Sequence, residues 1–146
     1  MSSELEREVR QEIEALHQFF VGWFSGELPE SEFEAGFLGR FDPGFVLIPP
    51  AGSLLQLEDL ASSIRAGHAS NPAFRIAIRK VRVQRVLDRH VLATYEEWQR
   101  NARASQPPDN GRIATVLFEQ ARPLRWLHVH ETWLPEPVQS AGPYDF

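Results

Sequence analysis

The stretch 124–134, Leu-Arg-Trp-Leu-His-Val-His-Glu-Thr-Trp-Leu, constrains the fold more than any other part of the chain. It contains no glycine or proline, is rich in β-branched and aromatic residues, and follows a turn signal at Arg122-Pro123, so it predicts a strand. Side chains alternate across a strand, so one face should carry Trp126, His128, His130 and Thr132, and the other Leu127, Val129, Glu131 and Trp133. Neither face is wholly apolar, which indicates burial on both sides with a polar task on at least one.

Length and composition limit the class of protein. The 146 residues fit one domain with a single core, and we predict one domain over 1–146 whose tail, 136–146, wraps the surface or is loosely held. The absence of cysteine excludes disulfides, thiolate metal ligation and thiol catalysis. No apolar run is long enough to span a bilayer, and the charged start of the chain is unlike a secretory signal, so we predict a cytoplasmic protein without a membrane partner.

The first half of the chain is predicted to form helices around one short strand. A capping box at Ser3 and Glu6 opens an amphipathic helix over 4–24, whose last turns are strongly aromatic. Phe20 and Trp23 there either belong to the core alone or also wall a ligand cavity. A short helix over 30–38, a strand at 45–48 and a helix over 57–69 follow.

The second half is predicted to be a run of strands: 74–87, 90–102, 111–121 and 124–134. A change of phase near Arg79-Lys80 indicates a bulge in the first of them. Helices followed by such a run predict an α+β fold, in which N-terminal helices pack on a curved, mainly antiparallel sheet. A long helix laid against a curled sheet leaves a cone-shaped space, where small ligands usually bind.

This order of elements resembles the nuclear transport factor 2-like superfamily, which has a cystatin-like cone. Its members include ketosteroid isomerase, SnoaL-like polyketide cyclases and the association domain of calcium/calmodulin-dependent kinase II. The stretch from His128 to Thr132 is similar to a His-x-His-x-Ser/Thr ending of the last strand in that association domain and in related bacterial domains of unknown function. A second similarity is Ala93-Thr94-Tyr95-Glu96. The association domain has pocket arginines where this chain has Glu96 and Glu131, so the resemblance implies an acidic pocket here.

Glu96 and Glu131 are the candidate catalytic pair. With the strand order of the superfamily, both are expected to point into the cone, with Trp98 and Trp133 beside them. Two carboxylates among aromatics, away from water, should include at least one with a raised pKa, which is how a general acid or base near neutral pH arises. In the competing interpretation each is held in an ion pair by an arginine such as Arg65, Arg100 or Arg112.

His128 and His130 share one face of the last strand. Such a pair can supply two metal ligands, but the only other strand histidine is His90, so we predict no metal and no cofactor. We expect this face to form a homodimer interface, as the outer sheet face often does in the superfamily. The strand 74–87 carries many arginines without interleaved aromatics, which is typical of a solvated sheet face; with the net charge of −5, we predict no nucleic-acid partner.

The leading prediction is a small-molecule-binding domain with a partly acidic, aromatic-lined pocket, whose ligand is unknown. Its predicted lining is Phe20, Trp23, Glu96, Trp98, Leu127, Val129, Glu131 and Trp133. The first alternative is a cofactor-independent isomerase, cyclase or dehydratase with Glu96 or Glu131 as general base. The second is a homo-oligomerisation module with an incidental cavity, and the sequence leaves all three open.

Overall fold

The structure is a computed structural model that describes residues 3–146. Its elements, in chain order, are α1 (Ser3–Ser25), η1 (Glu30–Glu32), α2 (Phe33–Gly36), η2 (Leu38–Arg40), β1 (Phe41–Ile48), β2 (Leu55–Gln56), α3 (Leu57–Ala66), β3 (Arg75–Leu87), β4 (His90–Arg100), β5 (Asn110–Glu119), β6 (Arg125–Trp133) and α4 (Glu136–Ala141). The predicted short helix over 30–38 is divided into three pieces, η1, α2 and η2. The predicted strand at 45–48 is longer and pairs with a two-residue strand, β2.

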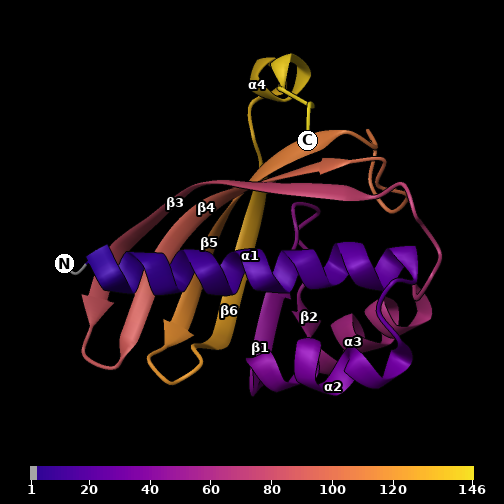
Figure 1. Cartoon of the computed structure of the whole chain (residues 1–146). Helices are drawn as coiled ribbons and strands as arrows, with labels where there is room; N and C mark the ends of the chain where they lie inside the picture. Colours follow the sequence, from indigo (N-terminus) through magenta and orange to yellow (C-terminus); the bar gives the residue numbers. More distant parts are fainter. Residues whose placement is uncertain (1–2) are drawn as a thin grey trace.

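One curved sheet carries all six strands, in the order β2-β1-β6-β5-β4-β3. Neighbouring strands are antiparallel except β1 and β6, which are parallel. Helix α1 runs across the sheet, while α2 and α3 lie at one end of it (Figure 1). This arrangement confirms the predicted α+β, cystatin-like fold.

The apolar stripe of α1 explains how the helix is fixed to the sheet. Its core-facing residues, all buried, are Val9, Ile13, Leu16, Phe19 and Trp23. A buried carboxylate ties the same helix to two other elements, because Glu12 Oε2 accepts hydrogen bonds from Arg40 Nη1 at 2.7 Å and from Trp126 Nε1 at 2.9 Å. A buried carboxylate is tolerated when such donors replace water.

Bulges control which side chains of the strands face inward. Lys80, with φ 55°, interrupts the register of β3 with β4 and confirms the bulge expected near Arg79-Lys80. Another register shift lies between β5 and β6, where Phe118 pairs with Trp126 but Leu117 pairs with His128. Leu127 is therefore the extra residue, and it puts Trp126 on the same face as Val129. The predicted simple alternation along this strand is wrong for Trp126.

The chain after β6 wraps back over the sheet. Helix α4 stands at one end of the molecule (Figure 1), and the segment beyond it is held by two arginines: Arg79 donates to the carbonyl of Pro143, and Arg100 donates to that of Tyr144. The Tyr144 ring contacts Trp98 edge-on at 5.6 Å. No helix within residues 3–146 combines the length and the apolar character needed to cross a bilayer.

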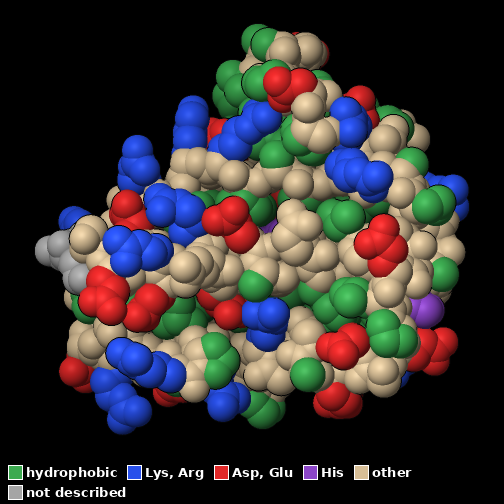
Figure 2. Space-filling model, in the orientation of Figure 1, with side chains coloured by type: hydrophobic (Ala, Val, Ile, Leu, Met, Phe, Trp, Pro, Cys, Tyr) green, Lys and Arg blue, Asp and Glu red, His purple; other side chains and the backbone are tan. Residues whose placement is uncertain are grey.

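Charged side chains are spread over the visible surface. On the face shown in Figure 2, basic and acidic groups are interspersed over α1 and the neighbouring strands, and neither sign gathers into one large patch. Such a mixed surface produces little long-range field of one sign.

Candidate functional site

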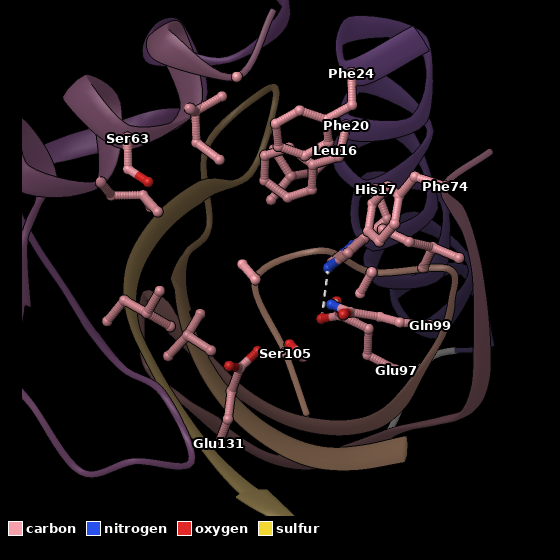
Figure 3. A pocket seen from close by; sticks show the side chains of 18 of the residues that line it. Leu16, His17, Phe20, Phe24, Ser63, Phe74, Glu97, Gln99, Ser105 and Glu131 are labelled. Atoms are coloured by element: carbon pink, nitrogen blue, oxygen red, sulfur yellow. Dashed lines mark hydrogen bonds and ion pairs between the residues drawn. The ribbon is translucent and has the colours of Figure 1, made fainter. Parts of the chain in front are cut away.

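A cavity of about 410 Å³ lies between α1, α3 and the concave face of the sheet. Its size falls within the usual range of small-molecule sites, roughly 300–1,000 Å³. Most of the wall is apolar or aromatic: Leu16, Phe20, Phe24, Phe41, Phe45, Leu47, Leu60, Ile64, Phe74, Ile76, Trp126 and Val129. Figure 3 shows several of these side chains around an open centre.

The polar side chains of the cavity come mainly from four elements. Alternate residues of β4 point inward and supply Tyr95, Glu97 and Gln99, as the twofold period of a strand requires. Arg112 comes from β5 and Glu131 from β6.

The fourth of these elements is α1, which contributes His17. This histidine lies four residues, about one helical turn, after Ile13. Both side chains are buried on the sheet-facing side of the helix. The apolar stripe that fixes α1 to the sheet therefore also brings the imidazole to the cavity wall.

His17 and Glu97 form a buried ion pair, marked by the dashed line in Figure 3. His17 Nδ1 lies 2.6 Å from the carbonyl oxygen of Ile13, and Nε2 lies 3.1 Å from Glu97 Oε1. Both partners accept hydrogen bonds, so the ring is satisfied when both of its nitrogens carry a proton. Burial lowers the pKa of His17, but the Glu97 charge and the hydrogen bonds outweigh it and leave the pKa raised.

Glu97 is held firmly in its ionised form. Burial alone would raise its pKa, but the charge and hydrogen bond of His17, followed by Arg112 and Gln99, lower it to about 2. Its second oxygen, Oε2, accepts a hydrogen bond of 2.6 Å from Gln99 Nε2. Both carboxylate oxygens are therefore engaged within the protein.

Glu131 is the contrasting carboxylate. Arg112 Nη1 donates to its Oε1 at 3.2 Å. Burial and the negative charge of Glu97 nevertheless raise the pKa of Glu131 to about 7, against the opposing effects of Arg112 and His17. Near neutral pH this side chain can therefore take up or release a proton, as a general acid or base does.

Two loops meet at the edge of the cavity. Residues 102–105, after β4, and residues 70, 71 and 74, before β3, all contribute to its lining. Asn71 Nδ2 donates to the carbonyl of Asn101 at 2.8 Å, and Arg103 Nη1 donates to the carbonyl of Ser70. These bonds fasten one loop to the other.

The structure places Glu96 and Trp98 on the opposite face of β4 from the cavity. Glu96 accepts a hydrogen bond from Trp98 Nε1 at 3.0 Å and lies 3.5 Å from Lys80 Nζ. The expectation that Glu96 points into the cone is wrong, because the inward residues of β4 are Tyr95 and Glu97. The glutamate of β4 that faces the cavity is therefore Glu97, one residue after the predicted Glu96.

The other predicted lining residues divide into two groups. Phe20, Val129 and Glu131 line the cavity, whereas Trp23, Leu127 and Trp133 are absent from its lining. Trp23 is buried in the core and donates to the carbonyl of Ile64, Leu127 is the bulged residue of β6, and Trp133 is 38% exposed beside Arg112.

Sequence reasoning misses His17, Tyr95 and Glu97 as cavity residues. A signal for His17 is present, since a histidine between Ile13 and Phe20 interrupts an apolar helix stripe. Arg112 is foreseen only as a possible ion-pair partner, and it is the partner of Glu131. Within residues 3–146 no cluster of three or more His, Cys, Asp or Glu side chains could hold a metal ion.

Comparison with solved structures supports the fold. A nuclear transport factor 2-like protein of unknown function from Pseudomonas aeruginosa has a TM-score of 0.76 and 23% identity, over 88% of this chain and 99% of that one. A cystatin-like protein from Caulobacter vibrioides has a TM-score of 0.66 and 15% identity, over 94% of each chain. A protein described as a calcium/calmodulin-dependent protein kinase type II association domain, from Thiobacillus denitrificans, has a TM-score of 0.53 and 19% identity, over 72% and 88%. The chain thus has the fold of nuclear transport factor 2-like proteins.

Sequence comparison adds one relative. The chain is 28% identical over 137 residues to sucrose-phosphatase 1 of Nicotiana tabacum, and the match covers 88% of this chain. The chain spans about a third, 31%, of the length of that relative. No family model matches the sequence.

Proposed function

We propose that this chain is a small-molecule-binding domain whose ligand occupies the cavity beneath α1. The observation that carries the proposal is the pairing of an apolar cavity of about 410 Å³ with a buried carboxylate, Glu131, only one of whose oxygens is hydrogen-bonded within residues 3–146. A mostly apolar wall with a few polar groups is the usual design of such sites.

A thermal-shift screen tests this function. The panel contains small amines, steroids, polyketide-like carbonyl compounds and saccharides, the last because the plant relative has sucrose in its name. A ligand raises the melting temperature by binding the native state preferentially. We expect hits with the wild type and with Glu96→Gln, whose changed side chain lies outside the cavity, and weaker shifts with Glu131→Gln. Equal shifts in all three proteins would place the ligand elsewhere.

A second candidate function is proton-transfer catalysis of the isomerase, cyclase or dehydratase type. The specific observation in its favour is the pKa of Glu131, about 7, which suits a general base or acid at neutral pH. Glu131 takes this role rather than Glu96, which lies outside the cavity. Turnover of a screening hit, lost in Glu131→Gln and retained in Glu96→Gln, is the expected result; binding without turnover favours a binding domain.

Assembly is compatible with either activity. We propose a homodimer through the outer sheet face, where two cross-strand rows carry Leu92, Leu117 and His128, and Thr94, Thr115 and His130. Ile113, 38% exposed, extends this face. Two of the solved structures with this fold are association or hub domains by name. Sedimentation measurements of the mass in solution test the proposal.

A further inference from the structure

Three polar side chains of the cavity, Asn71, Gln99 and Glu131, each keep one oxygen acceptor unbonded among residues 3–146. Gln99 directs its Nε2 at a carboxylate oxygen of Glu97, so the amide orientation is determined and Oε1 is left facing away. Asn71 likewise uses its Nδ2 for the Asn101 carbonyl, which leaves Oδ1. Among residues 3–146 no hydrogen bond reaches either oxygen.

Glu131 adds a third acceptor. Arg112 engages Oε1, and no group in the described part of the chain donates to Oε2. The hydroxyl of Tyr95, which also lines the cavity, has no hydrogen-bond partner within the same residues. The fully enclosed side-chain atoms without a partner there are Nε of Arg100 and of Arg112, and no oxygen is among them. The free oxygens of Glu131 and Tyr95 are therefore in contact with open space.

Several nitrogen donors of the cavity are engaged, whereas Nε of Arg112 and the hydroxyls of Tyr95 and Ser63 have no partner among residues 3–146. His17 gives both ring nitrogens to Ile13 and Glu97, and Arg112 gives Nη1 to Glu131 and Nη2 to Asn110. A ligand that brings only acceptors, such as a carboxylate, would meet two buried carboxylates and would leave the free oxygens of Glu131, Gln99 and Asn71 without a donor. Leaving polar atoms unpaired on binding is costly.

We propose that the cavity takes a neutral hydroxylated amphiphile, an apolar body with at least one hydroxyl group that donates a hydrogen bond to Glu131 Oε2. This inference rests on the proposed binding function and names the class of its ligand. A neutral ligand is favoured over an ammonium because three basic side chains of the same cavity, His17, Arg112 and Arg103, already balance its two carboxylates. The aromatic wall accommodates the apolar body, whose removal from water favours binding.

The test uses four compounds that share one apolar body: naphthylmethanol, its methyl ether, naphthoate and naphthylmethylamine. An adamantyl series with the same four groups varies the shape of the body. Affinities are measured by calorimetry with wild type, Glu131→Leu, which removes the acceptor, Glu131→Gln, which keeps one, and Glu96→Gln as the matched control.

We expect the alcohol to bind about tenfold or more tightly than its methyl ether, which cannot donate. The preference should disappear in Glu131→Leu; if the leucine variant does not fold, the preference should be weaker in Glu131→Gln than in Glu96→Gln. In the wild type, the preference for the alcohol over the ether should also grow between about pH 6 and about pH 8, as Glu131 ionises. An ether, carboxylate or amine that binds as tightly as the alcohol overturns the ligand class but leaves the binding function standing. If none of the compounds binds, the result contradicts both the proposed ligand class and the proposed binding function.

Discussion

At the scale of single residues, Glu97 and Glu131 show how surroundings determine the behaviour of a carboxylate. They lie in one cavity, yet the pKa of Glu97 is lowered to about 2 and that of Glu131 is raised to about 7. The difference follows from their partners: His17 and Gln99 engage both oxygens of Glu97, whereas Arg112 engages one oxygen of Glu131. Glu97 therefore stays ionised near neutral pH, whereas Glu131 can change its protonation state there.

Removal of the Glu97 charge should destabilise the fold. Glu97→Gln leaves His17 buried without its counter-ion, and breaking one partner of a buried pair typically costs about 3–5 kcal/mol. Glu96→Gln is the matched control, because Glu96 contacts the exposed Lys80 and should lose less than about 1 kcal/mol. Chemical denaturation at about pH 6 measures both. Equal losses would contradict the assignment of the inward carboxylate to position 97.

The pH dependence of stability should identify Glu131. Its folded-state pKa lies above its value of 4.5 in the unfolded chain, so its contribution is fully present below about 4.5 and is lost as the pH rises through about 7. Glu131→Gln should match the wild type near about pH 4 and exceed it by up to a few kcal/mol above about pH 8. Thermal unfolding of both proteins across this pH range checks the sign of the stability difference. A Glu131→Gln variant that is less stable than the wild type above neutral pH would contradict the raised pKa of Glu131.

The choice between positions 96 and 97 shows what the sequence could not decide. Both are glutamates on a strand whose two faces are each partly buried, with Tyr95 on one and Trp98 on the other. Composition does not reveal which alternate residues of β4 face the cavity, since aromatic residues occur on both faces of the strand. The C-terminal segment covers Trp98, and that contact is remote in sequence.

At the scale of elements, bulges bend the strands and determine which of their residues face the cavity. The bulge near Arg79-Lys80 is predictable because the alternation of β3 changes there. The one at Leu127 is not, because both candidate faces of β6 carry aromatic and ionisable residues. The helices are easier to predict, since the apolar stripe of α1 is long and regular.

The bulge at Lys80 provides a test. With φ 55°, Lys80 adopts a left-handed conformation that a β-branched residue tolerates poorly. Lys80→Val should lower stability by about 1–2 kcal/mol, whereas Lys80→Gly should be neutral or stabilising. Denaturant titrations of the two variants separate backbone strain from loss of the Lys80–Glu96 contact, which both remove. Equal stabilities would contradict the bulge.

At the scale of the whole molecule, the helices cover one face of the sheet, and the C-terminal segment covers the other face at Trp98. Ile113 lies on the outer face at 38% exposure, and Val138 on α4 is comparably exposed at 42%. If the proposed dimer uses the outer face, Ile113→Glu should yield a monomer, because a charge enters an apolar contact. Val138→Glu is the control and should leave the mass unchanged. Sedimentation velocity gives the masses, and a dimer that survives Ile113→Glu would contradict the interface.

The most direct test of the account is a crystal structure of the protein with naphthylmethanol. We expect the apolar body beneath α1, against Phe20 and Val129, and the hydroxyl oxygen at hydrogen-bond distance from Glu131 Oε2. A compound bound on the outer sheet face, or a cavity that stays empty at saturating concentration, would contradict the claim that this cavity is the ligand site.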